Sequence, residues 1–269
     1  MFINKAIKES TRSLVHILKH SYSKVIVVAE LEAESESYAL TPGRILGRNY
    51  RVLDYLGNGW EGEVYKVEEC RTGIIRAAKL FYKHCYKITK PHIFYAKKLN
   101  KLRSCPIIIQ YHNQDVVTVR KEKVDFLISD YVSGEVLSEF VAKQKNKKLN
   151  PFEALNLFYA LVQGVEHIHF QGEYHGDLHA DNIMIQRKGL SFEVKLIDFL
   201  HLGRPTKLKI QEDVYDLIGV FYDMLGGQKH YKDLPANIKG IILGRKKNLI
   251  AKKFKMAGHL RLYLENLTW

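Results

Sequence analysis

The pattern of apolar and polar residues changes near residue 132, and this change constrains the fold more than any other feature of the sequence. From Tyr50 to about Val132, most segments alternate apolar and polar residues or are rich in β-branched ones, as strands are. From Asn150 onward, apolar residues recur at spacings of three and four, which is typical of amphipathic helices. Strands first and helices second predict an α+β protein with two parts of different character, joined near Gly134.

Length and composition fit a globular protein of this kind. The 269 residues are 46% hydrophobic and 26% charged, so a core can form, and no apolar run near the start approaches the roughly 18 residues that span a bilayer. The formal net charge of +13 favours anionic partners, such as nucleotides, nucleic acid, a membrane or an acidic protein. Three scattered cysteines make neither a disulfide framework nor a zinc pair, which predicts a reducing, cytoplasmic location.

We expect three segments along the chain. Residues 1–47 are predicted to be an extension made of a helix and a short strand, and residues 48–132 a strand-rich part. Residues 133–269 are predicted to be helical. The extension could regulate the protein, dock a partner or complete the sheet of the strand-rich part.

Three glycines, Gly57, Gly59 and Gly62, form a G-x-G-x-x-G frame in the stretch LGNGWEGEVYKV. Such a frame can cradle the phosphates of a dinucleotide, cradle those of ATP, or mark a tight turn. A dinucleotide turn needs a helix after the glycines, whereas the residues that follow read as a strand. The glycines are therefore placed at the tip of a β-hairpin, where their amides could cover phosphates and Val64 could roof a base.

Polar residues appear at three further points in otherwise apolar contexts. Lys79 lies in the strand-like AAKLF, so it must either reach solvent or meet a negative partner. The segment YHGDLHADN places Asp177 five residues before Asn182, which supplies a carboxylate for a proton and an amide oxygen for a metal. His175 and His179 allow a zinc site as an alternative, although this segment precedes a strand and does not form a helix. Asp198 ends an apolar strand and suits Mg²⁺ bound to phosphates.

This ordered set resembles the protein kinase-like superfamily. Its parts are the glycine frame with Val64, Ala77-x-Lys79, His175-Gly176-Asp177 with Asn182, and Asp198-Phe199. The set is closest to compact bacterial eukaryotic-like serine/threonine protein kinases and has features of the aminoglycoside and choline kinase branch. The resemblance implies a two-lobed fold, with a β-rich N-lobe, a shortened helical C-lobe and an N-terminal extension. It also implies ATP and Mg²⁺ as cofactors.

The resemblance assigns a role to each matching residue. Gly57, Gly59 and Gly62 would cover the ATP phosphates, Val64 and Ala77 would sandwich adenine, and Lys79 would hold the α- and β-phosphates. Asp177 would accept the proton of the acceptor hydroxyl, while Asn182 and Asp198 would hold Mg²⁺.

Further roles follow for the connection between the lobes and for the helical lobe. Asp130 to Val132 would offer backbone hydrogen bonds to adenine, and Glu135 could reach the ribose. Asp213 would brace the catalytic loop.

The sequence departs from the family pattern at three points. The helix that should offer a glutamate to Lys79 contains no acid, and Tyr95 or Ala96 falls where that glutamate is expected. Glu61 is our candidate substitute, and a solvated acid at the hairpin tip is the alternative interpretation of this residue. Leu200 stands where glycine usually follows Asp-Phe, which makes a flipping switch less suited to this position. Only fifteen residues lead from Asp198 to Asp213, which leaves little for a peptide platform.

Three functions remain open from the sequence. The first is a Mg-ATP-dependent serine/threonine protein kinase, and a small-molecule kinase is the alternative that the short segment after Asp198 favours. A nucleotide-binding pseudokinase is the third. An anionic partner could also bind the basic segment Arg245–Lys255, although such runs are usually solvated. The acceptor, a protein or a small hydroxyl compound, is not identified by the sequence.

Overall fold

The computed structural model describes residues 37–59, 61–86, 90–189, 191–199 and 204–267. The helix and short strand expected before residue 37, and Leu200, lie outside these described residues. The chain divides into two compact units, Met1–His92 with Gln114–Ile128 and Ile93–Asn113 with Ser129–Trp269. The sequence places domain boundaries at 47/48 and 132/133. These boundaries separate the expected extension and lobes, and they stay a prediction.

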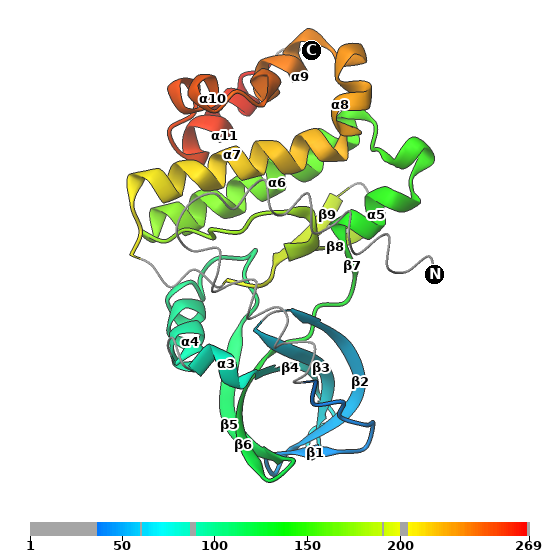
Figure 1. Ribbon diagram of the computed structural model, residues 1–269. Helices are drawn as coiled ribbons and strands as arrows, with labels where there is room; N and C mark the ends of the chain where they lie inside the picture. The colour runs from blue at the N-terminus through cyan, green and yellow to red at the C-terminus, as the bar shows by residue number, and fades with distance from the viewer. Residues whose placement is uncertain (1–36, 60, 87–89, 190, 200–203, 268–269) are drawn as a thin grey trace, which may run out of the picture. The chain divides into compact units, whose positions relative to one another are not determined.

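The first unit is built on a six-stranded sheet of order β1-β2-β3-β4-β6-β5, which curves around an apolar core (Figure 1). The neighbours β1-β2, β2-β3 and β3-β4 are antiparallel. The strands are Ile45–Leu46 (β1), Tyr50–Gly59 (β2), Gly62–Glu69 (β3), Ile75–Phe81 (β4), Tyr111–Val119 (β5) and Glu122–Asp130 (β6). Two helices accompany them in the sequence, Lys83–Tyr86 (α3) and Pro91–Lys101 (α4).

The register of β3 and β4 sorts their side chains onto two faces. Tyr65 lies opposite Ala78, and both are buried in the core. Val64 lies opposite Lys79, and Lys66 lies opposite Ala77. Because side chains alternate along a strand, Val64, Ala77 and Lys79 share the face that points away from the core. The register thus places together the three residues expected to meet the nucleotide.

One expected strand is interrupted. The run VVTVRKEK reads as a single strand, but the structure turns at Arg120 and Lys121, between β5 and β6. Both residues have positive φ, 50° and 70°, as the two central residues of a type I′ hairpin turn require. Glycine or asparagine usually marks such a turn, and because neither is present here the sequence carried no signal for it.

The second unit is dominated by two long helices that lie side by side, Pro151–Phe170 (α6) and Lys207–Met224 (α7) (Figure 1). The rings of Phe158 and Phe221 stack between them at 4.3 Å. As the sequence predicts, α6 begins at Pro151, and the side chain of its cap Asn150 accepts a hydrogen bond from the Glu153 amide at 2.9 Å.

Shorter elements complete this unit. A three-stranded sheet has the order β7-β8-β9. Its strands are Glu135–Val136 (β7), Ile183–Lys188 (β8) and Ser191–Leu196 (β9). The remaining α-helices are Leu137–Lys143 (α5), Gly227–His230 (α8), Ala236–Ile242 (α9), Lys247–Lys253 (α10) and Ala257–Glu265 (α11). Single 3₁₀ turns occupy Lys145–Lys147, Ala180–Asn182, Tyr231–Asp233 and Leu243–Arg245.

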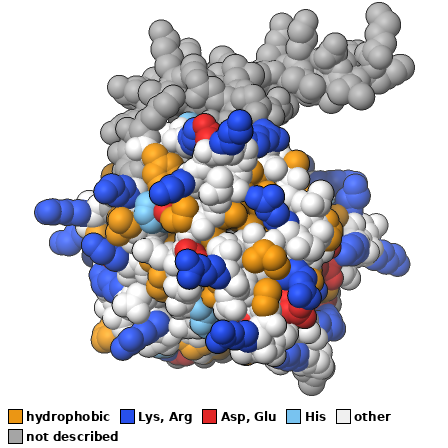
Figure 2. Space-filling view, turned by 90° about the horizontal axis from the view of Figure 1, so that it is seen from below, with side chains coloured by type: hydrophobic (Ala, Val, Ile, Leu, Met, Phe, Trp, Pro, Cys, Tyr) orange, Lys and Arg blue, Asp and Glu red, His pale blue; other side chains and the backbone are white. Residues whose placement is uncertain are grey.

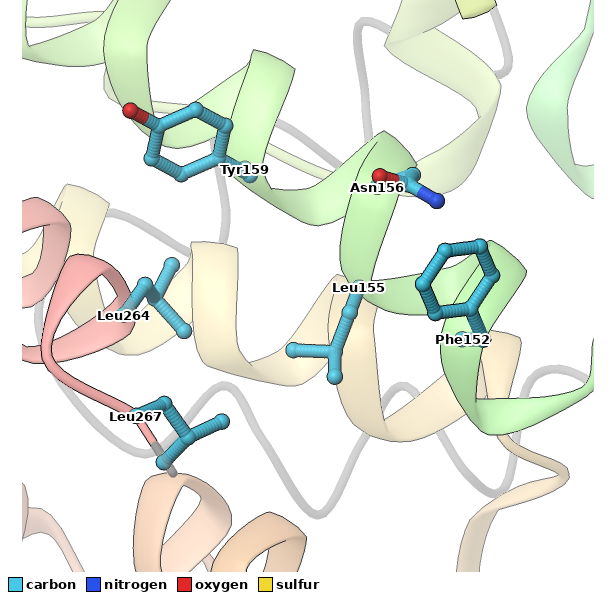
Figure 3. Close-up of a pocket in the computed structure, with 6 residues that line it drawn as sticks. All are labelled: Phe152, Leu155, Asn156, Tyr159, Leu264 and Leu267. Carbon is cyan, nitrogen blue, oxygen red and sulfur yellow. The ribbon is translucent and has the colours of Figure 1, made fainter. Parts of the chain in front are cut away.

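An open hollow lies between α6 and the C-terminal end of α11 (Figure 3). Its lining is mostly apolar: Phe152, Leu155, Asn156, Tyr159, Leu264 and Leu267. No residue that the sequence nominates for catalysis or nucleotide binding lines it. Within the described residues, no helix has both the length and the apolar character needed to cross a membrane.

Gly62 should be intolerant of a side chain because β3 approaches β4 closely there. A Cβ at Gly62 would lie 1.8 Å from the Leu80 carbonyl oxygen, whereas a Cβ at Gly59 would meet no atom within 4 Å. We expect Gly62→Ala to lower the free energy of unfolding by about 1–3 kcal/mol, as overpacking does. Gly59→Ala, the matched control on the same hairpin, should change it by about 0.5 kcal/mol or less.

Urea unfolding of the two variants and the parent protein measures both values. Equal stability losses for the two alanine variants would contradict the close approach of β3 to β4.

Candidate active site

A buried carboxylate on α7 holds the loop that contains Asp177. The Asp213 side chain is fully buried and accepts hydrogen bonds from the backbone amides of His175 and Gly176, each at 2.7 Å. His169 Nε2 lies 3.1 Å from the same carboxylate, and His169 Nδ1 lies 3.4 Å from the Ala257 amide, so Nε2 is the nitrogen that donates to Asp213. Asp213 therefore braces the loop, in the role that the kinase resemblance gives it.

His175 orients the loop as a neutral imidazole. Burial lowers the pKa of His175 to about 4, so the ring is uncharged at neutral pH. Its Nε2 donates to the Ile197 carbonyl at 3.2 Å, and its Nδ1 accepts from the Asp177 amide at 3.2 Å. The ring also packs on Phe199, with centroids 4.4 Å apart. His175 thus ties the loop to the end of β9, and a neutral ring held in this way is unsuited to proton transfer.

Asp177 is exposed, and its carboxylate is held by Asn182. The Asn182 Nδ2 donates to the Asp177 carbonyl at 3.0 Å and to its carboxylate at 3.2 Å. The Nε2 of His179 lies 3.4 Å from that carboxylate, and this hydrogen bond raises the pKa of His179. These contacts favour an ionised Asp177, the form that can accept a proton.

The loop and Asp198 are joined through Asn182. The Ile197 amide donates to the Asn182 carbonyl at 3.0 Å, so the residue before Asp198 is fixed to the loop. Asp198 itself adopts a left-handed backbone conformation, with φ 56°. The structure therefore joins Asn182 both to Asp177 and to the residue before Asp198, while the roles of the three residues stay predictions.

The donor set of these residues fits Mg²⁺. Because Nδ2 of Asn182 faces Asp177, its amide oxygen is the atom that could face a metal, and the Asp198 carboxylate is a hard oxygen ligand of the kind Mg²⁺ prefers. The zinc alternative needs several His, Cys, Asp or Glu side chains gathered around one point. No such group of three or more occurs among the described residues.

Lys79 forms an ion pair with Glu61 in the first unit. The Lys79 ammonium donates to Glu61 Oε2, and the two side chains are only 13% and 6% exposed. Lys79 thus meets a negative partner and does not reach solvent. That partner is the acid that the sequence nominated from the hairpin tip.

The predicted nucleotide contacts near the junction have partners of their own. The Asp130 amide donates to the Gln110 carbonyl at 3.0 Å, so what Asp130 could offer adenine is its carbonyl and not its N–H. Glu135, the predicted ribose contact, accepts a hydrogen bond from Lys143. The roles of Asp130, Val132 and Glu135, like those of the glycines, Val64 and Ala77, stay predictions.

Two residues of α4 contact Phe199, and their contacts were not predicted. The Phe199 amide donates to the Tyr95 hydroxyl at 3.0 Å, so the position expected to hold a glutamate binds the backbone after Asp198. The Lys98 ammonium lies 4.8 Å from the Tyr174 ring centroid and 5.6 Å from that of Phe199, and burial lowers the pKa of Lys98 to about 8. These contacts join α4 to residues far away in the sequence, so the sequence carried no signal for them.

The basic segment Arg245–Lys255 is divided between a 3₁₀ turn, α10 and the loop after it. Its cations lie over rings of the same unit: Arg245 and Lys247 over Tyr215 at 5.0 and 4.8 Å, and Lys253 over Tyr263 at 3.8 Å. Figure 2 shows another face of the molecule, on which basic side chains are spread over the surface. An anionic partner for this segment stays a prediction.

Comparison with known proteins agrees with the fold. A model of the protein kinase domain matches residues 50–223, which is more than half of the chain. The chain therefore belongs to the protein kinase family, and the expected α+β kinase fold is confirmed. The kinase domain of PknI from Mycobacterium tuberculosis superposes with a TM-score of 0.63 at 18% identity, over 84% of this chain and 97% of that domain.

Curated relatives are similar at lower coverage. The "negative regulator of sexual conjugation and meiosis" of Schizosaccharomyces pombe is 29% identical over 56% of this chain and 32% of that protein. "CBL-interacting protein kinase 1" of Oryza sativa is 29% identical over 66% of this chain and 36% of that protein. A probable serine/threonine-protein kinase of Streptomyces coelicolor is 26% identical over 58% and 23%. The chain thus spans about a third or less of these relatives.

Asp213→Ala should be strongly destabilising because it leaves two buried backbone amides and His169 without their acceptor. The two backbone amides alone should account for a loss of about 2–6 kcal/mol in the free energy of unfolding, since each unsatisfied buried group costs about 1–3 kcal/mol. Asp216→Ala on the same helix is the matched control. Burial raises the pKa of Asp216 to about 6, so its ionised form is already disfavoured and its loss should cost little.

Denaturant unfolding of both variants at neutral pH measures the difference. Similar stability for Asp213→Ala and Asp216→Ala would show that Asp213 does not hold the loop.

Proposed function

We propose that the chain is a Mg-ATP-dependent phosphotransferase that acts as a serine/threonine protein kinase. The observation that carries this proposal is the linked set on the second unit, in which Asp213 braces the loop, Asn182 holds Asp177 and the Asn182 carbonyl binds the residue before Asp198. Asp177 would thereby supply a carboxylate for a proton, and Asn182 and Asp198 would supply oxygen ligands for a metal, as phosphoryl transfer requires. The family match and the kinase names of the relatives support the same activity.

The chain's own residues would contribute mainly by positioning. Lys79 would hold the α- and β-phosphates, and the amides of the glycine hairpin would cover them. Asp177 would accept the proton of the acceptor hydroxyl. The hydroxyl oxygen would form a bond to the γ-phosphorus while the bond between that phosphorus and the ADP oxygen breaks. Asn182 and Asp198 would hold Mg²⁺, which when bound neutralises the charge on the phosphate oxygens.

A small-molecule kinase is the alternative acceptor class. Helix α7 begins at Lys207, nine residues after Asp198, and already contains Asp213. In typical protein kinases this interval is longer and forms the peptide platform. The short interval therefore favours a small hydroxyl compound over a docked peptide, whereas the curated relatives favour a protein acceptor.

A nucleotide-binding pseudokinase is the second alternative. It is disfavoured because Lys79, Asp177, Asn182 and Asp198 are all present and Lys79 has a carboxylate partner.

Transfer of the γ-phosphate from labelled ATP tests the proposal. The intact chain should label a protein acceptor in the presence of Mg²⁺, and Asp177→Ala should reduce the rate by about 100-fold or more, since positioned acid–base groups contribute about 10²–10⁴-fold. Asp198→Ala should abolish the Mg²⁺-dependent transfer, because it removes an expected metal ligand. Asp181→Ala, which removes an exposed acid of the same loop that is bonded to Ser138, is the matched control.

The acceptor panel decides between the classes. Label found only on sugars, amines or aminoglycosides would favour the small-molecule kinase. Labelling that is unaffected by Asp177→Ala, or absent with every acceptor while ATP still binds, would contradict the proposed kinase activity.

A further inference from the structure

We propose that Glu61, at the tip of the glycine hairpin, positions Lys79 in place of the helix glutamate that protein kinases use, and that this makes the ion pair independent of α4. The inference rests on the proposed kinase function and adds a positioning residue to it. In protein kinases the corresponding lysine pairs with a glutamate of the helix before the fourth strand, and helix position controls that pair.

The ion pair of Glu61 and Lys79 is largely shielded from solvent. Lys79 Nζ donates to Glu61 Oε2, with side-chain exposures of 13% and 6%. Glu61 precedes β3 by one residue, and its side chain reaches Lys79 of β4 from the tip of the hairpin. An exposed pair would contribute little, but a pair this buried leaves an uncompensated charge when one partner is removed. Loss of the Glu61 carboxylate should therefore disturb the position of Lys79.

The backbone that carries Glu61 is fixed to β4 and α3. The Tyr82 amide donates to the Glu61 carbonyl at 2.8 Å, and the Cys85 thiol lies 3.6 Å from the same oxygen. The next residue, Gly62, is so close to β4 that a Cβ would meet the Leu80 carbonyl. Glu61 is thus delivered by a docked segment, which suits a positioning role better than a freely swinging one.

Helix α4 has no acid to offer and is occupied elsewhere. Its sequence, PHIFYAKKLNK, contains neither Asp nor Glu, and Tyr95 binds the Phe199 amide. Most of α4 belongs to the compact unit that carries Asp177 and Asp198, whereas Glu61 and Lys79 both belong to the other unit. The lysine pair is therefore formed within one unit, and a displacement of α4 would leave it intact.

The rival possibility is an inhibitory latch. A carboxylate on a loop that covers phosphates repels them, so Glu61 could keep Lys79 away from the nucleotide until the pair opens. The two roles predict changes of opposite sign when the charge is removed. Glu61→Gln slows turnover if Glu61 positions Lys79, and speeds turnover or tightens ATP binding if Glu61 is a latch.

The experiment compares the full chain with Glu61→Gln, Lys79→Met and the double variant. Glu61→Gln should lower kcat/KM for Mg-ATP by about 10- to 100-fold, because a misplacement of about 1 Å can cost on the order of 100-fold. The double variant should be no slower than Lys79→Met, since residues that act as a unit are not additive. A purely structural role for Glu61 would instead give additive losses.

The matched control is Asp54→Asn on the same hairpin. Asp54 is exposed and accepts a hydrogen bond from the Tyr55 amide. Turnover of Asp54→Asn should therefore stay within about twofold of the parent. Glu63 is unsuitable because it is 1% exposed and accepts hydrogen bonds from Tyr38, Tyr65 and Tyr82. A Glu61→Gln protein as active as Asp54→Asn, or more active, overturns the inference.

A second readout separates this inference from the proposed function. If the parent shows no turnover that depends on Asp177, the kinase proposal fails, and the Mg-ATP-induced rise in Tm of the same four proteins decides the role of Glu61. Loss of that rise in Glu61→Gln, with no further loss in the double variant, supports positioning. A rise that is retained or enlarged in Glu61→Gln overturns it.

Discussion

A lysine ammonium in a nearly dry strand needs a negative partner, and this requirement governs the first unit. Moving an unpaired ammonium out of water costs several kcal/mol, and the Glu61 carboxylate offsets this cost for Lys79 in β4. Glu61 can reach it only because the hairpin tip docks on β4, which in turn requires a glycine at position 62. One electrostatic need thereby fixes the conformation of the loop expected to cover the phosphates.

A second buried charge does the same for the second unit. The Asp213 carboxylate is satisfied by two backbone amides and by His169 Nε2. Because the amides belong to His175 and Gly176, satisfying the carboxylate fixes the loop that presents Asp177. Asn182 then extends this order to Asp198 through the Ile197 amide. In both units, hydrogen bonds or an ion pair stabilise a buried side chain, Lys79 in one and Asp213 in the other. The same contacts fix the hairpin tip that carries Glu61 and the loop that carries Asp177.

Three features could be predicted because they depend on local periodicity, capping or motif spacing. They are the order of strands before helices, the start of α6 at Pro151, and the grouping of Asp177, Asn182 and Asp198. The turn at Arg120 and Lys121 could not, because neither residue is one that favours positive φ. The bond between Tyr95 and the Phe199 amide could not either, since it joins residues 104 positions apart whose side chains carry no pairing signal. The sequence indicated the pair of Glu61 and Lys79 only through the absence of an acid from the segment that forms α4.

A crystal structure of the full chain with Mg²⁺ and a non-hydrolysable ATP analogue is the most direct test of how the buried charges serve the nucleotide. It should show the Lys79 ammonium bound to Glu61 and to the α- and β-phosphates together, with Asn182 and Asp198 on the metal. A Glu61 carboxylate turned away from Lys79 while the phosphates are bound, or a metal held without Asn182 and Asp198, would contradict it.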